Sequence, residues 1–326
     1  MQGIFLGLQA LFIALFCTFL PGKIWAQDFP NKVVRIVVPF PPGGSAEAQA
    51  RIIAQKLSEA WGQPVLVDSK PGAGTTIGAA FVANSPADGH TLYLAGNTSH
   101  VVSAILHKDT IKYDAIKSFA GVSLIAKSPF ILTVNPNVPA TNVKEFIEWA
   151  RTKQGATTYA SSGNGAGPHL SGELLQMMTN TKMTHVPFKG TAPGLVALLS
   201  GEVDAQFADV AVVPHLQSGK LRGLAVTSSA RSPLFANLPT ISESGVPGYD
   251  VTYLSAILAP AGTPKAIINK INSAVNVALA LPDVRQRLNA QGFEPSGSSP
   301  DSLDALFQAE MLKYEKLIRD SGMKVD

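Results

Sequence analysis

The sequence predicts an α/β protein built from two domains. Short β-branched runs alternate with segments of helical periodicity, beginning with a buried-strand pattern at 33–38 and a helical pattern at 46–57. A second series of the same kind starts at 130–134. This alternation indicates βαβ units, in which helices cover both faces of a mostly parallel sheet. At 326 residues the chain is long enough to form two such units.

The remaining elements follow in chain order. The first series continues with strands at 65–67 and 91–94 and a helix at 76–83. The second series predicts strands at 158–160, 185–188, 205–207 and 224–226, and helices at 143–149, 169–178 and 195–199. A strand-like run at 253–258 precedes three helical stretches near 264–281, 283–291 and 301–321. These last helices are expected to cover the first sheet, so the chain is predicted to cross between domains near 125–130 and near 240–255. The predicted domains are therefore 27–127 plus 252–326, a discontinuous α/β domain, and 128–251.

The N-terminal segment has the pattern of an export signal. Residues 4–20 are almost all apolar, and the stretch that follows ends in Trp25-Ala26-Gln27. We expect a signal peptide cleaved after Ala26 and a mature protein in the periplasm. A retained membrane anchor is the alternative, because residues 1–3 carry no Lys or Arg and the apolar run is marginal for a bilayer. Cys17, the only cysteine, lies in this segment, so the mature chain needs no disulfide.

Charge and motif spacing exclude several classes of function. A net charge of +3 without a cluster of Lys and Arg argues against nucleic-acid binding and against attraction to a membrane surface. Gly72-Ala-Gly74 follows a strand, but Ile77 stands where a dinucleotide fingerprint requires its third glycine. The chain has no Gly-x-Ser-x-Gly motif and no two histidines within four residues of each other. We therefore expect no enzyme, no cofactor and no metal, although a triad assembled from distant residues stays open.

Two glycine- and serine-rich loops point to ligand binding. Phe40–Ser45 and Ser161–Pro168 each lie between a predicted strand and a predicted helix. Such a loop exposes backbone N–H groups at a helix N-terminus, where the helix dipole favours an anion. Gly43 and Gly44 let a ligand approach the backbone without a clash with Cβ. Neither loop contains arginine, which favours recognition by backbone, hydroxyl and water. A plain strand-to-helix turn is the alternative for either loop alone.

Other polar residues lie near these loops in the predicted fold. Glu47, on the first helical turn, either accepts a hydrogen bond from a polar group of a ligand or only stabilises its helix. Thr98 and Ser99 follow a predicted parallel strand, at the end where ligands bind. His169 is either a neutral donor or a surface histidine, and the direction of Asp209 stays open. The predicted ligand-binding residues are Phe40, Pro42, Gly43, Gly44, Ser45, Glu47, Thr98, Ser99, Ser161, Ser162, Gly163, His169 and Asp209.

Short motifs in register along the chain resemble a known family. They include Phe40-Pro-Pro-Gly-Gly-Ser45, Lys70-Pro-Gly-Ala-Gly74, Ala87-Asp-Gly-His-Thr91, Tyr159-Ala-Ser-Ser-Gly163, His185-Val-Pro-Phe-Lys-Gly190, Leu224-Ala-Val-Thr227 and Leu258-Ala-Pro-Ala-Gly-Thr-Pro264. Together they resemble the Bug family, the extracytoplasmic solute receptors of tripartite tricarboxylate transporters. The chain departs from the family pattern at Glu47, where the family has aspartate, and at Ala208, where many members carry an aspartate.

The resemblance implies a two-domain, periplasmic-binding-protein-like fold of type II with a ligand cleft between its domains. It also implies the large and small membrane subunits of a tripartite transporter as partners. We expect a monomer whose two glycine-rich loops close by a hinge on a small organic carboxylate. A sensing module that feeds a membrane signalling protein, and a structural or adhesive role, are the alternatives.

Overall fold

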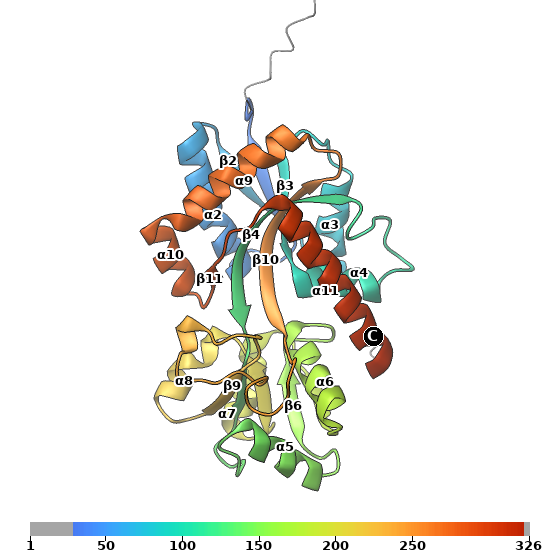
Figure 1. Cartoon of the computed structure of the whole chain (residues 1–326), viewed down its shortest axis with the longest axis vertical. Coiled ribbons are helices and arrows are strands. Elements are labelled where there is room, and N and C mark those ends of the chain that lie inside the picture. The colour runs from blue at the N-terminus through green and yellow to red at the C-terminus, as the bar shows by residue number, and fades with distance from the viewer. Residues whose placement is uncertain (1–28, 323–326) are drawn as a thin grey trace, which may run out of the picture. The chain divides into compact units, whose positions relative to one another are not determined.

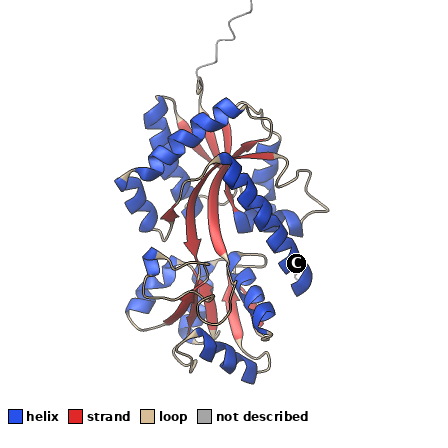
Figure 2. Cartoon of the chain, viewed as in Figure 1, coloured by secondary structure: helices blue, strands red, loops and turns tan. Residues whose placement is uncertain are grey.

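The computed structural model describes residues 29–322, and the chain from Lys32 onward forms one compact unit. Two β-sheets and the helices that cover them make up this unit (Figures 1 and 2). The first sheet has the order β11-β4-β10-β3-β1-β2, with β1 Val34–Val38, β2 Val65–Ser69, β3 Thr91–Gly96, β4 Phe119–Pro129, β10 Thr252–Pro260 and β11 Glu294–Pro295. The second has the order β7-β6-β8-β5-β9, with β5 Ile131–Val134, β6 Thr158–Ser161, β7 Thr184–Pro187, β8 Ala205–Ala208 and β9 Arg222–Val226.

Eight of the helices of the described chain lie close to the positions that periodicity predicts, and two short ones, α4 and α8, were not predicted. They are α2 Ser45–Trp61, α3 Thr76–Ala83, α4 Ser103–Leu106, α5 Val143–Thr152, α6 Gly167–Thr179, α7 Thr191–Ser200, α8 Val213–Gln217, α9 Lys265–Ala280, α10 Pro282–Asn289 and α11 Pro300–Ser321. Short turns of other helix types are η1 Ala73–Thr75, η2 Asn97–Val102, η3 Val210–Val212 and η4 Pro233–Phe235. In α2, residues at helical spacing from Ala46 to Leu57 are buried, and Gly62 ends the helix with a φ of 64°.

The prediction of mostly parallel sheets is wrong, because both sheets are mixed. Strand β1 pairs in parallel with β2 and β3, but β10 is antiparallel to both β3 and β4. In the second sheet β6 is parallel to β7 and β8, whereas β5 is antiparallel to β8 and β9. Strand β4 has no counterpart among the predicted elements. Nearly all of its residues are buried, so it lacks the alternation that marks a half-exposed strand.

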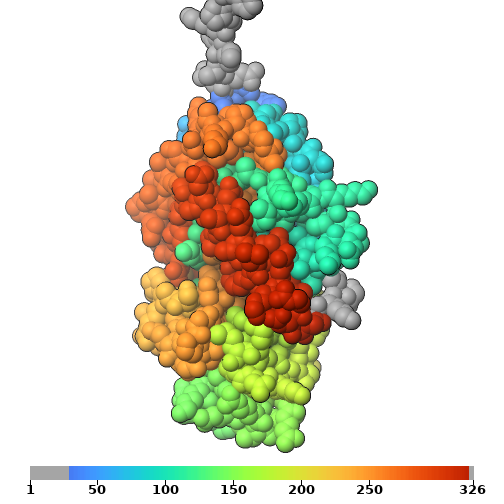
Figure 3. Space-filling view, turned by 45° about the vertical axis from the view of Figure 1, so that its right-hand side comes forward, coloured from blue at the N-terminus to red at the C-terminus, as the bar shows by residue number. Residues whose placement is uncertain are grey.

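The three C-terminal helices cover the first sheet, as expected from the sequence. Helices α9 and α11 contact β4, and α10 contacts β11. Helix α11 also contacts α6, which belongs to the second sheet's part of the chain, and it runs over the surface towards that helix (Figure 3). Helix α11 therefore contacts both predicted domains, in addition to the strands that cross between them.

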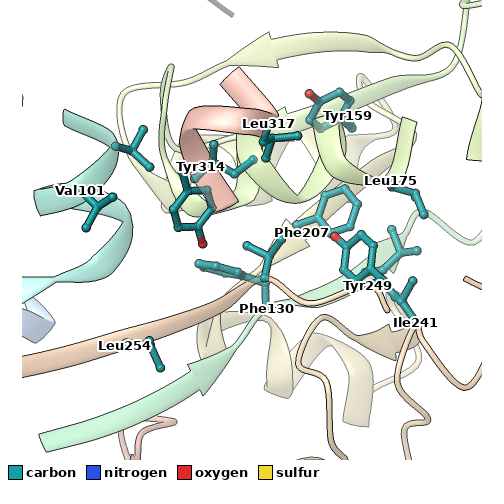
Figure 4. Close-up of a cluster of buried hydrophobic side chains, with 14 of the residues drawn as sticks. Val101, Phe130, Tyr159, Leu175, Phe207, Ile241, Tyr249, Leu254, Tyr314 and Leu317 are labelled. Atoms are coloured by element: carbon teal, nitrogen blue, oxygen red, sulfur yellow. The ribbon is translucent and has the colours of Figure 1, made fainter. Parts of the chain in front are cut away.

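One hydrophobic core runs through the parts of the chain that form both sheets. It includes Tyr93 of β3, Phe207 of β8 and Tyr314 of α11, all fully buried. Figure 4 shows Tyr314 of α11 beside Phe130, which lies between β4 and β5. A second cluster packs α7 against the other face of the second sheet. Because the main core is continuous, the exact domain boundaries at 127/128 and 251/252 stay a prediction.

Candidate ligand-binding site

The loops after β1, β2 and β3 meet at one edge of the first sheet, because these three strands are parallel. The Thr75 hydroxyl, in the loop after β2, donates to the Ser99 carbonyl after β3 at 2.8 Å. A Cβ on Gly78 would lie 3.1 Å from the Pro39 side chain after β1, so these segments pack closely. The predicted residues from Phe40 to Glu47, with Thr98 and Ser99, therefore belong to one region.

The first glycine-rich loop is open to solvent. Pro42, Gly43, Gly44 and Ser45 are exposed, and Phe40 is half-buried. Gly43 has a φ of +92°, which requires glycine, and nothing lies within 4 Å of where its Cβ would be. The loop ends at helix α2, whose N-terminus has no side-chain cap. Its backbone is thus accessible to a ligand.

Glu47 is engaged within the protein. Its carboxylate accepts a hydrogen bond from the Gly43 N–H and a second from the Arg51 Nε, the latter at 2.8 Å. The Gly43 hydrogen bond first, and Arg51 next, lower the pKa of Glu47 below its usual range. The side chain is 10% exposed. Glu47 therefore ties the first loop to α2, in addition to any contact with a ligand.

Thr98 and Ser99 lie in η2, a single π-helical turn at the end of β3. Thr98 is buried, and Ser99 is half-buried with its hydroxyl donating to the Gly96 carbonyl at 3.2 Å. Asn97, which was not among the predicted ligand-binding residues, holds this turn to β10. Its amide donates to the Thr252 carbonyl and accepts from the Leu254 N–H, both at 2.9 Å. Single π-helical turns often mark functional sites.

The second glycine-rich loop follows β6 at the corresponding edge of the second sheet. Ser161 is fully buried, and its hydroxyl accepts the Gly163 N–H at 3.1 Å and lies 2.6 Å from His185 Nε2. The Ser161 carbonyl accepts the Phe188 N–H after β7 at 3.0 Å. Ser162 and Gly163 are half-buried. Buried Ser161 thus shapes the loop, whereas Ser162 and Gly163 are partly accessible and Asn164 is exposed.

His169 supports the same loop from helix α6. Its Nδ1 accepts the Gly165 N–H at 3.0 Å, and its ring stacks on that of His185 with 3.7 Å between centroids and 8° between planes. Burial first, and His185 next, lower the pKa of His169 to about 3. His169 is therefore neutral at physiological pH. It is 7% exposed, which argues against a helix-surface histidine.

Asp209, directly after β8, reaches the same edge but caps a helical turn. Its carboxylate accepts the Ala211 N–H at 3.0 Å, at the start of η3. The side chain is half-buried. Its direction, which the sequence left open, is thus along its own chain towards η3.

The two edges approach each other through Gly165. A Cβ at this glycine would lie 2.8 Å from Leu106 of α4 and 3.5 Å from Val102 of η2. Gly165 also has a φ of +73°, so its conformation favours glycine. This contact places the second glycine-rich loop against the segment that follows Thr98 and Ser99. Whether Phe40–Ser45 shares a ligand with Ser161–Gly163 stays a prediction.

Four helices that begin at these edges have no side-chain cap. They are α2, α3, α6 and α7, whereas Asn142 caps α5 and Ser299 caps α11. The two glycine-rich loops predicted from the sequence lead into α2 and α6, whereas the start of α7, at Gly190 and Thr191, was not predicted as part of a site. A glycine directly before a helical run was the signal that could have found it.

Other features of the described residues do not add a site. A groove of about 670 Å³ lies between α2 and α9, and one of about 400 Å³ lies beside β2; neither contains a predicted ligand residue. Within residues 29–322 no group of three or more His, Cys, Asp or Glu side chains could hold a metal ion. No helix in the same range is long and apolar enough to cross a membrane.

Comparison with known proteins connects this geometry to a family. Residues 49–323 match the family model described as tripartite tricarboxylate transporter family receptor. The chain is 33% identical to protein BugT of Bordetella pertussis over 93% of this chain and 94% of BugT. It is similar to the solved structure of R. palustris Rpa4515 with adipate, at 36% identity and a TM-score of 0.78 over 91% of this chain and 99% of that one. MatC of Rhodopseudomonas palustris with bound malate is 33% identical, with a TM-score of 0.74 over 89% of this chain and all of MatC.

Proposed function

The chain belongs to the receptor family of tripartite tricarboxylate transporters, as its motifs indicated, and on this premise we propose that it captures a small organic carboxylate for such a transporter. The family is one of solute receptors, which favours transport over a signalling module. We also propose that the carboxylate binds at the two glycine-rich loops. The large and small membrane subunits of the transporter would then receive it.

The observation that carries the proposal is the pair of uncapped helix starts behind the two glycine-rich loops. Helix α2 begins after Gly44, and α6 begins after Ala166, each at the carboxyl edge of a mixed sheet. Uncapped N–H groups and the helix dipole together attract an anion. Two of the similar solved structures hold adipate and malate, which are carboxylates. The ligand of this chain is proposed to lie between Phe40–Ser45 and Ser161–Gly163, with Thr98 and Ser99 as a wall.

A thermal unfolding series tests the ligand class. The refolded, ligand-stripped protein would be heated with mono-, di- and tricarboxylates, and with their amides and neutral sugars as controls. A ligand that binds only the folded state raises the unfolding midpoint in a saturable way. We expect a carboxylate to do so where its amide does not. If no carboxylate shifts the midpoint, the proposed ligand class is wrong.

Two variants test the loops. A Cβ at Gly44 would meet only the Pro41 carbonyl at 3.9 Å, so Gly44→Val is expected to fold and to obstruct the first loop. Ser162→Ala removes a hydroxyl from the surface of the second loop. Both should weaken carboxylate binding, while Ser200→Ala at the far end of α7 should not. Unchanged affinity in both loop variants would remove these loops from the site.

We also propose that the protein is exported to the periplasm. Residues 1–26 lie outside the described residues, so a signal peptide cleaved after Ala26 and the periplasmic location rest on the sequence and the family. The mass of the protein recovered from a periplasmic extract tests both. A mature N-terminus at Gln27 is expected, whereas an intact N-terminus in the membrane fraction would indicate a retained anchor.

A further inference from the structure

The chain after β2 holds four consecutive residues in the left-handed region of backbone conformation. Their φ angles are +125° at Gly72, +45° at Ala73, +59° at Gly74 and +83° at Thr75. Glycine adopts such angles readily, whereas a side chain makes them unfavourable. A branched side chain such as that of threonine is the least suited to them. Thr75 is therefore a strained residue, at the end of a glycine-rich turn that the proposed ligand site does not include.

Hydrogen bonds hold Thr75 in this conformation. Its side chain is buried, and its hydroxyl donates to the Ser99 carbonyl at 2.8 Å. Its N–H donates to the Gly72 carbonyl at 3.0 Å. In the opposite direction, the Ser103 hydroxyl donates to the Gly74 carbonyl. Two side-chain hydrogen bonds thus join the strained turn to the segment formed by η2 and the start of α4.

The carbonyl that Thr75 binds belongs to the proposed wall of the ligand site. It lies in η2, which carries both Thr98 and Ser99. Asn97 ties the first residue of this turn to β10, and Thr75 ties the third residue to the chain before α3. A hydrogen bond to the Ser99 carbonyl fixes the peptide plane of that residue, and with it the direction of its side chain. Strained residues persist where the surrounding structure holds them, and they are concentrated at functional sites.

We propose that Thr75 is a positioning residue for ligand binding, whose hydroxyl holds the Ser99 carbonyl and so keeps Thr98 and Ser99 directed at the ligand. This inference rests on the proposed function and adds to it a residue that acts through η2. Stability and binding favour different residues at position 75. The backbone conformation favours glycine, whereas the hydrogen bond to Ser99 requires a hydroxyl. Substitutions at this position can therefore separate an effect on binding from an effect on stability.

Three variants of Thr75 make this separation. Thr75→Ala and Thr75→Gly both remove the hydroxyl, but only glycine relieves the strain, so the glycine variant should unfold at a higher temperature than the alanine variant. Thr75→Ser keeps the hydroxyl. Ala73→Gly is the matched control, because it relieves strain at an exposed residue of the same turn and leaves the hydroxyl in place. Circular dichroism establishes that each variant is folded.

Calorimetry would titrate each protein with succinate, malate, adipate, citrate and benzoate. For the carboxylate that the wild type binds most tightly, we expect Thr75→Ala and Thr75→Gly to raise the Kd by about fivefold, the loss of one hydrogen bond. Thr75→Ser and Ala73→Gly should stay within about twofold of the wild type. The glycine variant should bind as weakly as the alanine variant although it is the more stable of the two.

Three results would overturn this inference and leave the proposed function standing. The first is wild-type affinity in both variants that lack the hydroxyl. The second is affinity that recovers together with stability in Thr75→Gly, because Thr75 would then act only on stability. The third is an equal loss of affinity in Thr75→Ser or Ala73→Gly. If the wild type binds none of the five carboxylates, the proposed function fails and this inference fails with it.

Discussion

Thr227 and Phe130 join the two segments through which the chain passes between its sheets. The Phe130 N–H donates to the Thr227 hydroxyl at 2.8 Å, and the Thr227 N–H donates to the Phe130 carbonyl at 2.9 Å. The same Thr227 donates its hydroxyl to the Val251 carbonyl at 2.7 Å and accepts the Val251 N–H at 2.9 Å. One fully buried residue thus links the outgoing crossing to the returning one.

Thr227→Val should destabilise the protein, because it leaves the buried Phe130 N–H and Val251 carbonyl without their partner. A buried unpaired polar group costs about 1–3 kcal/mol. Urea unfolding measures the loss, and Thr227→Ser, which keeps the hydroxyl, should retain most of the stability. Equal stability of the valine variant and the wild type would mean that the crossing segments are held by other contacts.

His169→Asn should reduce the acid sensitivity of folding. Asparagine offers an acceptor for the Gly165 N–H but does not titrate between pH 3 and 7. In the wild type the pKa of His169 is about 3 when folded and about 6.5 when unfolded. The unfolded chain therefore takes up a proton that the folded chain does not, and stability present above pH 6.5 is lost as the pH falls towards 3.

The free energy of unfolding of both proteins, measured from pH 7 to pH 4, tests this prediction. One such group contributes a slope of at most about 1.4 kcal/mol per pH unit. His100 is also buried with its pKa lowered to about 4, so the variant should lose only part of the wild-type slope. Glu173 and His185 face His169 and stay in place in the variant. If the free energies of unfolding of the wild type and His169→Asn depended on pH in the same way, His169 would not be the group that takes up the proton on unfolding.

Glu47→Gln should strengthen the binding of simple carboxylates. Glutamine still offers an oxygen to the Gly43 N–H, but it removes a negative charge from the start of α2, where a ligand anion is proposed to bind. Calorimetry at low ionic strength should give a several-fold lower Kd, and the difference should shrink with added salt. Weaker binding would instead mean that Glu47 accepts a hydrogen bond from the ligand, the other reading of this residue.

Gly172→Ala should destabilise the protein, because Gly172 lies where helix α6 packs against the second sheet. A Cβ there would lie 2.2 Å from the ring of the fully buried Tyr159, whose hydroxyl is held by Glu173 at 2.8 Å. Overpacking of this kind costs about 1–3 kcal/mol. Gly44→Ala, with no atom closer than 3.9 Å, is the matched control and should unfold like the wild type. A stable Gly172→Ala protein would show that the Tyr159 ring can move.

Much of the fold and part of the site could be predicted from sequence. The alternation of strands and helices, the three C-terminal helices and both glycine-rich loops depend on residues close together in the chain, so their patterns are visible locally. Strand β4 was not predicted, because it is buried on both faces and therefore lacks an alternation of apolar and polar residues. The prediction of mostly parallel sheets was wrong, because β10 is antiparallel to its neighbours β3 and β4. Strand direction depends on which distant strands pair.

The roles of individual site residues were decided by tertiary structure. The sequence by itself determined that Glu47, His169 and Asp209 lie near helix starts at strand ends. Only folding decided that the Glu47 carboxylate turns to Gly43 and Arg51, and that His169 stacks on His185 beneath the loop. The physical reason is that hydrogen bonds and ring contacts form between groups that the fold brings within a few ångströms, whatever their separation in the chain. Thr227 lies in the motif Leu224-Ala-Val-Thr227, but that motif does not indicate that its hydroxyl joins Phe130 to Val251.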